Sequence, residues 1–208
     1  MDEDGELFQR WCDGDQAAGN VLFQRHFSSV YCFLQHVVHA PEDAEELVQE
    51  TFLDCVRNKD KFRHESNVRT FLFGIARNRL HMYWRQRAKT DRELDFESIS
   101  VEDLTTTPRT RIGRGEDHQR LLIALRSLPL EHQLLLMLHY WEGMDQYQLG
   151  EVFDVAPATT RSRMFRAREA LRERLQAMAG DSASGLPEMS LEDLDQWARS
   201  LYAEGRSE

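Results

Sequence analysis

Residues 146–175 read QYQLGEVFDVAPATTRSRMFRAREALRERL, and this stretch decides the fold class. Its first eight residues predict a short helix, because Leu149, Val152 and Phe153 fall on one side at helical spacing. The next four predict a turn with Val155 as its buried residue, and Pro157 suits the first turn of a second helix over 158–175. Two helices joined in this way are typical of modules that bind duplex DNA.

The second predicted helix carries its basic side chains mainly in its N-terminal half. A recognition helix places that half in the major groove, where arginine reaches guanine edges and phosphates. We therefore predict DNA contacts there, although a basic helix packed on a helical bundle would have the same composition. The side chains concerned are those of Arg161, Ser162, Arg163, Phe165, Arg166 and Arg168.

The chain has a net charge of −10, yet its basic residues gather in two segments. Residues 61–92 hold nine basic and two acidic side chains, and residues 157–174 hold six and two. Because salt confines each charge to its own neighbourhood, the two segments predict two surfaces that contact phosphates. Solvated arginines on long helices are the alternative explanation.

The first basic segment also contains an apolar row. On a helix predicted over 68–89, Phe73, Arg77, Leu80 and Trp84 share one side, apart from a core stripe of Val68, Phe71, Leu72, Ile75 and Tyr83. Aromatic and basic side chains in such a row can hold unstacked bases. The polar loop before it, residues 61–67, suits capture of one extruded base. Packing of Phe73 and Trp84 beneath the preceding helices is the alternative.

A further helix is predicted to begin at Pro41, which precedes a run of carboxylates at the positive end of the helix dipole. One side is expected to face the core and consists of Ala44, Leu47, Val48, Thr51, Phe52, Cys55 and Val56. The opposite side is expected to face solvent and consists of Glu46, Gln49, Glu50, Leu53 and Arg57.

Two segments lie outside these helices. Residues 90–117 lose helical periodicity and gather acidic residues, Ser, Thr, Pro and Gly, which predicts a linker. After residues 180–185, Ser190 and Asp193 form a capping-box pattern that predicts a short amphipathic helix over 191–202. This tail could regulate the protein, bind a partner or cap the second domain.

Several classes of protein are disfavoured by composition and motifs. No apolar run approaches the roughly 20 residues that a membrane span needs, and the acidic N-terminus is unlike a secretory signal, so a cytoplasmic location is expected. Cys12, Cys32 and Cys55 are an odd number without a CxxC pair, which disfavours a disulfide framework.

Metal and catalytic chemistry are also disfavoured. Cys32, His36 and His39 could bind a metal, but the apolar helix around them favours ordinary core packing. We find no Gly-rich phosphate loop, HExxH motif or Ser-His-Asp set. The sequence therefore predicts no catalytic residue, no metal and no cofactor.

Three stretches together resemble one known family. PEDAEELVQETFLD (41–54), FRHESNVRTFLFGIARNRLH (62–81) and the region 125–176 occur in the order and spacing of extracytoplasmic-function (ECF) sigma factors of the sigma-70 family. The resemblance runs from residue 41 to residue 176. It implies a factor that directs bacterial RNA polymerase to promoters and initiates transcription.

The resemblance also implies roles for individual residues. The surface that would bind the clamp helices of the largest polymerase subunit comprises Glu46, Gln49, Glu50 and Leu53. The surface that would bind the promoter −10 element comprises Lys61, Arg63, His64, Glu65, Ser66, Asn67, Arg77, Asn78 and Trp84. The −35 element would meet Thr160, Arg161, Ser162, Phe165 and Arg166. Core RNA polymerase, promoter DNA and an anti-sigma factor are the implied partners.

The expected architecture is all-α, with two small helical domains and a short C-terminal helix. Region 2 would span residues 1–90, the acidic linker 91–117, the helix-turn-helix region 4 residues 118–179, and the C-terminal extension 180–208. Two alternatives remain at this point: a DNA-binding regulator whose first domain senses a ligand, and an enzyme that uses Cys32 or a histidine cluster. Co-purification with core polymerase would separate the first alternative from a sigma factor.

Overall fold

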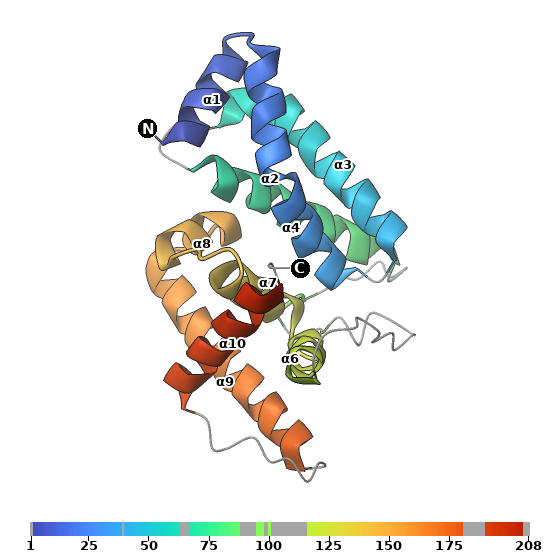
Figure 1. Cartoon of the computed structure of the whole chain (residues 1–208), viewed down its shortest axis with the longest axis vertical. Helices are drawn as coiled ribbons and strands as arrows, with labels where there is room; N and C mark the ends of the chain where they lie inside the picture. The colour runs from blue at the N-terminus through green and yellow to red at the C-terminus, as the bar shows by residue number, and fades with distance from the viewer. Residues whose placement is uncertain are drawn as a thin grey trace. The chain divides into compact units, whose positions relative to one another are not determined.

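The computed structural model describes residues 2–38, 40–62, 67–87, 95–97, 100, 116–180 and 190–205. Within these ranges the regular structure is helical, and the isolated bridge between Ser100 and Pro129 is the only strand-like pairing. The helices run in chain order as α1 (Glu3–Cys12), α2 (Gln16–Val37), α3 (Pro41–Asn58), the 3-10 turn η1 (Lys59–Lys61), α4 (Val68–Arg87), α6 (Glu116–Arg126), α7 (Leu130–Tyr140), α8 (Gln146–Phe153), α9 (Pro157–Gly180) and α10 (Leu191–Gly205) (Figure 1). The all-α prediction is confirmed.

The helix starts agree closely with the sequence patterns. The starts of α3 at Pro41, α4 at Val68 and α10 at Leu191 are as predicted, and α8 has the predicted bounds. Ser190 and Asp193 form the predicted capping box, since each backbone N–H donates to the other residue's side chain at 3.1 Å. Helix α9 is longer than predicted and continues to Gly180.

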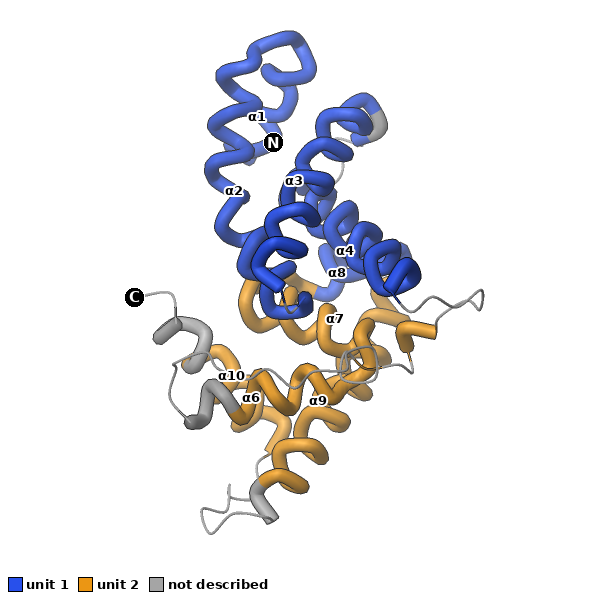
Figure 2. The backbone as a smooth tube through the Cα atoms, turned by 90° about the vertical axis from the view of Figure 1, so that its right-hand side faces the viewer, with its two compact units in different colours: residues 1–89, 146–156 blue, residues 90–145, 157–208 orange. Residues whose placement is uncertain are grey.

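The chain forms two compact units (Figure 2). Unit 1 consists of residues 1–89 and 146–156, and unit 2 consists of residues 90–145 and 157–208. Helix α8 belongs to unit 1 because it packs on α4, where the Arg77 guanidinium lies 4.8 Å from the centre of the Phe153 ring. This division follows packing, so the domain boundaries expected from the sequence stay predictions.

The core of unit 1 begins at the N-terminal hairpin of α1 and α2. Asp2 caps α1 by accepting a hydrogen bond from the Gly5 backbone at 2.9 Å, and Asp15 caps α2. Phe8 and Trp11 of α1 are buried, and their rings meet edge to face with centroids 5.3 Å apart. Together with residues of α2, α3 and α4 they form one cluster, whose buried members are Phe8, Trp11, Ala18, Leu22, Cys55, Phe62, Val68 and Leu72.

Helix α4 presents a different side to the core than the sequence suggested. Phe73, Leu80 and Trp84, predicted to face DNA, are buried, whereas Phe71, Ile75 and Tyr83 are only partly buried. Phe73 and Trp84 therefore follow the alternative interpretation, in which they pack beneath other helices, and Val68 and Leu72 of the predicted core stripe are buried as expected. Because α4 is apolar on most of its circumference, the side that packs depends on how α2, α3 and α8 surround it.

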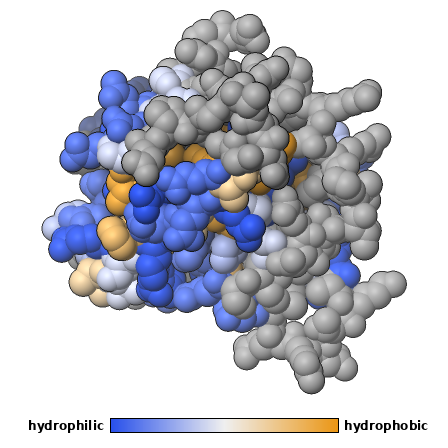
Figure 3. All heavy atoms as spheres, turned by 90° about the horizontal axis from the view of Figure 1, so that it is seen from below, coloured by the Kyte–Doolittle hydropathy of each residue, from blue (hydrophilic) through white to orange (hydrophobic). Residues whose placement is uncertain are grey.

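Unit 2 is built around α7, which is buried along nearly its whole length between α6, α9 and α10. Leu194 and Ala198 of α10 are fully buried one helical turn apart. In the view from below, hydrophilic residues predominate among the described atoms, and apolar residues are visible in patches between them (Figure 3). Among the described residues, no helix is both long enough and apolar enough to cross a membrane.

Candidate nucleic-acid interface

The outward face of α9 carries four of the five side chains predicted to meet the −35 element. Arg161, Ser162 and Arg166 are exposed, and Phe165 is 59% exposed although it is a large apolar residue. Thr160 corrects the prediction, because it is only 1% exposed. It lies in line with the buried residues Met164, Ala167 and Leu171 at helical spacing and therefore belongs to the packed side of α9.

A short part of the predicted linker lies against this helix. Glu97 forms an ion pair with Arg163 of α9. The preceding Phe96 is buried, and its carbonyl accepts a hydrogen bond from the Glu131 backbone N–H at 3.0 Å, near the start of α7. Sequence reasoning missed this docking. A lone aromatic residue inside an acidic, polar segment was the available signal.

Two arginines of α4, a helix whose basic side chains were predicted to contact phosphates, form ion pairs with carboxylates of α3. Arg79 donates to Asp54 at 2.7 Å and to Glu50 at 3.1 Å, both on α3. Arg87 donates to Asp43 at 2.6 Å, also on α3. These two cations help to hold α4 on α3.

Two of the predicted −10 contacts on α4 differ in exposure. Asn78 is exposed, as a DNA contact requires. Trp84 is 2% exposed and packs edge to face with Tyr83 at 4.9 Å between ring centroids, so its ring face is not open to a base. The assignment of Trp84 to DNA binding is corrected on this ground.

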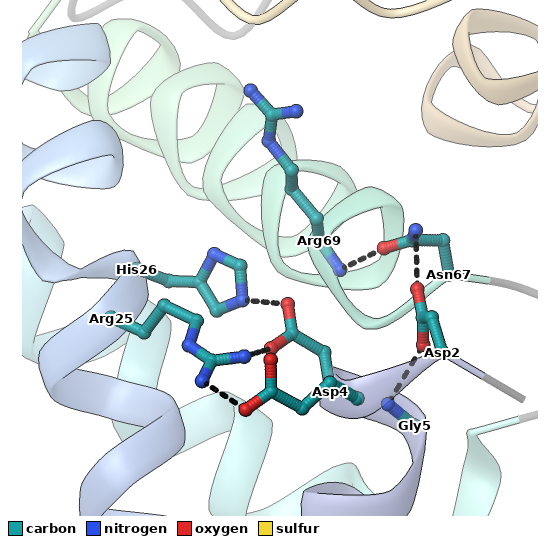
Figure 4. Close-up of polar contacts among 8 residues, drawn as sticks. Asp2, Asp4, Gly5, Arg25, His26, Asn67 and Arg69 are labelled. Carbon is teal, nitrogen blue, oxygen red and sulfur yellow. Dashed lines mark hydrogen bonds and ion pairs between the residues drawn. The ribbon is translucent and has the colours of Figure 1, made fainter.

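The predicted base-capturing loop is described only at its ends. Lys61 closes the 3-10 turn η1, and Arg63, His64, Glu65 and Ser66 lie outside the described residues. Asn67 is held from both sides: its Oδ1 accepts from the Arg69 backbone at 2.8 Å and its Nδ2 donates to Asp2 at 3.0 Å (Figure 4).

The neighbouring ion pairs tie α1 to α2. Asp4 accepts from Arg25 at 2.5 Å and lies 2.7 Å from His26 Nε2 (Figure 4). Since Asp2 also holds Asn67, the end of the loop is fixed to the same short helix that packs on α2. The N-terminal hairpin therefore positions the beginning of α4.

Helix α3 presents the predicted polar face together with apolar side chains. Glu46 and Gln49 are exposed, and Leu53 is 52% exposed. Glu50 is half-buried because it accepts from Arg79. Val56, predicted to lie in the core, is 43% exposed. It therefore lies at the edge of the packed side of α3.

Sequence reasoning missed Phe27 of α2. Its ring is 50% exposed and lies nearly parallel to those of Phe52 and Tyr31, each with centroids 6.2 Å away. We call Phe27, Leu53 and Val56 the exposed apolar set of α2 and α3. These helices pack on each other, and apolar area exposed on them is available to a protein partner.

Among the residues that the structure describes, no group of three or more His, Cys, Asp or Glu side chains has the arrangement of a metal site. Cys32 is exposed rather than a core thiol, and His39 lies outside the described residues. Cys55 is buried, and burial raises the pKa of its thiol to about 12.

Family models match two separate parts of the chain. The model for sigma-70 region 2 matches residues 22–90, and the model for sigma-70 region 4 matches residues 118–171. The chain belongs to the sigma-70 family. This sigma factor is therefore a transcription initiation factor that acts with RNA polymerase at specific promoters. The region 4 match includes residues 157–171 of α9.

Individual relatives agree with the family assignment. An ECF RNA polymerase sigma-E factor of Salmonella typhimurium is 28% identical over 183 residues, which cover 84% of this chain and 95% of that one. The ECF resemblance seen in the sequence is confirmed by this relative and the two family models.

Two solved sigma factor structures share the fold. CnrH, solved in complex with the cytosolic domain of CnrY, superposes with a TM-score of 0.63 at 20% identity and covers 87% of this chain and all of that one. RpoE of Bartonella quintana, solved with the anti-sigma factor NepR, gives a TM-score of 0.57 at 22% identity and covers 74% and 93%. Both comparisons extend over the greater part of this sigma factor.

Proposed function

We propose that this sigma factor recognises the promoter −35 element through the outward face of α9. The observation that supports this most directly is the combination on that face of Arg161, Ser162, Arg166 and the 59% exposed Phe165. Arginine donors suit guanine edges, and an exposed aromatic ring suits the methyl group of thymine. A large apolar side chain held in solvent is unfavourable unless a partner covers it.

The test of this assignment is Arg166→Ala. If Arg166 contacts a base, its loss weakens binding at that promoter position by about 1–3 kcal/mol and relaxes the preference there. The measurement is the affinity of holoenzyme for promoters with each base at every −35 position. Arg174→Ala is the control, because Arg174 is an exposed arginine at the distal part of the same helix.

Equal weakening on every sequence would contradict base recognition and assign Arg166 to a phosphate. The same weakening in the Arg174→Ala control would show a general charge effect instead of a contact specific to the N-terminal half of α9.

Helix α3 and the adjacent part of α2 supply the proposed polymerase-binding surface. Glu46 and Gln49 give it exposed polar groups, and the exposed apolar set of α2 and α3 gives it area that binding would remove from water. Glu50 is expected to contribute less directly, because its carboxylate already accepts from Arg79.

Replacing Leu53 with Ala and Glu46 with Lys should weaken binding to core polymerase by more than tenfold, since buried apolar anchors and charge complementarity both contribute to such interfaces. The measurement is equilibrium binding of the labelled variant to core enzyme, with circular dichroism as the check on folding. Met82→Ala is the matched control, since Met82 is a comparably exposed apolar side chain on α4. Unchanged affinity in the double variant would refute the interface assignment.

The proposed −10 surface consists of the loop 61–67 together with Arg77 and Asn78 of α4. The exposed Asn78 amide can hydrogen-bond a base or sugar, and Asn67 at the end of the loop is held by Asp2 and by the Arg69 backbone. We also propose that an anti-sigma factor restrains this sigma factor. The solved complex of RpoE with NepR supports that proposal by similarity of fold.

A further inference from the structure

The C-terminal helix α10 is packed as an integral part of unit 2. It lies against α6, α7 and α9 (Figure 1). Its apolar side places Leu194 and Ala198 in the core, and its first turn is fixed by the Ser190–Asp193 capping box. The region 4 family model ends at residue 171, so α10 lies beyond the part that the family shares.

One carboxylate on α10 connects α7 with α9. Asp195 accepts a hydrogen bond from the Tyr140 hydroxyl of α7 at 2.5 Å. Its other oxygen lies 2.8 Å from the guanidinium of Arg168, which belongs to α9. Arg168 is largely covered, and its Nε atom is buried without a hydrogen-bond partner among the described residues. The Asp195 carboxylate therefore compensates the charge of this largely covered cation.

A histidine extends the same network. His139 Nδ1 lies 3.0 Å from the Met144 carbonyl, so this nitrogen must carry the proton that it donates. Nε2 is then the acceptor, and Arg168 and Arg199 donate to it at 3.1 and 3.3 Å. Met144 lies in the turn that follows α7, so the network connects this turn with α9 and α10.

We propose that α10 contributes to recognition of the −35 element. In this proposal Asp195 is a positioning residue that holds α9 in its orientation through Arg168. The inference rests on the proposed function of α9. Arg168 lies two residues beyond Arg166, so a contact that holds Arg168 also sets the rotation of the segment that would meet DNA. Without Asp195, Arg168 has no carboxylate to pair with and turns toward solvent. The N-terminal half of α9 is then no longer held in one orientation relative to the rest of the unit.

The test compares full-length Asp195→Asn with the unmodified chain, each assembled with core polymerase. The readout is the ratio of open-complex formation on a promoter with its preferred −35 element to that on the same promoter with this element scrambled. We expect the ratio to fall about tenfold, because a base contact that is no longer aligned discriminates between sequences about tenfold less well. Glu192→Gln is the control, because Glu192 is an exposed carboxylate on the same helix.

A purely structural role for α10 would lower the melting temperature but leave the ratio unchanged, because the ratio does not depend on how much protein is folded. That result would overturn the inference. Exchange of the two charges, Arg168→Asp with Asp195→Arg, should recover part of the ratio that either single change loses. Absence of any recovery would count against Asp195 acting through Arg168.

Two further results keep the outcome unambiguous. If Asp195→Asn does not fold, Asp195→Glu replaces it, because this variant keeps the carboxylate but displaces it by one methylene. Its ratio should lie between the ratio of the control and complete loss of −35 preference. An unchanged ratio overturns the inference. If the unmodified chain shows no −35 preference at all, the proposed function of α9 fails. A preference that is present and insensitive to Asp195 refutes only the positioning role.

Discussion

His139 lies among groups that favour its neutral form. Burial lowers the pKa of His139 below its ordinary value of 6.5, and the nearby guanidinium groups of Arg168 and Arg199 lower it further. The Met144 carbonyl and the Asp195 carboxylate act in the opposite direction and are outweighed. The neutral ring is also the form that the hydrogen bonds require, because Nε2 must accept from both arginines.

This arrangement predicts how stability depends on pH. The unfolded chain binds a proton at His139 near pH 6.5, and the folded chain binds it only at lower pH. The contribution of the neutral ring is therefore fully present above pH 6.5 and is lost as pH falls through the lower folded pKa.

The measurement is the free energy of unfolding by urea at pH 8, 6.5 and 5 for the unmodified chain and His139→Gln. The stability difference between the two should shrink toward pH 5. A separate His132 variant is needed, because burial lowers the pKa of His132 as well. The stability that His132 contributes therefore also decreases as the pH falls. A difference that stays constant with pH would show that the charge state of His139 does not matter.

Single residues also show where sequence reasoning stops. The exposure of Arg161, Ser162, Phe165 and Arg166 could be predicted, because α9 has a polar side that is easy to distinguish from its apolar side. Trp84 could not be placed in the same way. On α4, apolar side chains occur all around the helix, and the choice between them is made by contacts with helices far away in the sequence.

At the scale of the helix, the pairing of α1 and α2 depends on one close approach. A Cβ atom at Gly19 would lie 2.6 Å from a ring carbon of Trp11, and the ring is nearly completely buried. Trp11 is held on its other side by Phe8 and Phe23, so it cannot give way easily. Only a glycine therefore lets α2 pack this closely against α1.

Gly19→Ala should destabilise the chain by about 1–3 kcal/mol, the cost of overpacking a closed core. Gly74→Ala is the matched control, because Gly74 is also in a helix but a Cβ there would meet no atom within 4 Å. That control should gain up to about 1 kcal/mol, since alanine favours the helix. Thermal or urea unfolding of both variants measures the difference. Stabilisation by both changes would contradict the packing argument.

Helix boundaries were predictable for a local reason. Pro41, Pro157 and the Ser190–Asp193 capping box act within one turn of the helix that they begin, so no distant contact is needed to interpret them. The docking of residues 95–97 was not predictable in that sense. Phe96 is buried, and its carbonyl accepts a hydrogen bond from the first turn of α7. This geometry exists only in the assembled unit and leaves no local pattern in the sequence.

Over the whole molecule, many basic residues are paired internally. Arg79 and Arg87 pair with carboxylates of α3, and Arg163 pairs with Glu97. The count of basic side chains in the sequence therefore overstates the positive charge available to DNA, which is one reason that charge alone could not assign a function. The pairing also means that Glu97, in an acidic segment of the chain, neutralises Arg163 on α9, the helix that we propose recognises the −35 element.

This pairing predicts a gain of DNA affinity when Glu97 is changed to Gln. Released Arg163 can contact one more phosphate, so the slope of log affinity against log salt concentration should become steeper by about 0.9. Fluorescence anisotropy of a labelled duplex between 50 and 200 mM salt, a range suited to such contacts, measures this slope for the full chain. Glu192→Gln removes an equal charge from α10 and should leave the slope unchanged.

A second change distinguishes release of Arg163 from the general loss of a negative charge. In the double variant Glu97→Gln with Arg163→Ala, the steeper slope should disappear, because the cation that gained a phosphate is gone. Phe96→Ala should behave like Glu97→Gln, since it removes the buried anchor that holds Glu97 beside α9. If the double variant kept the steeper slope, the added contact would arise elsewhere and the pairing of Glu97 with Arg163 would have no bearing on DNA binding.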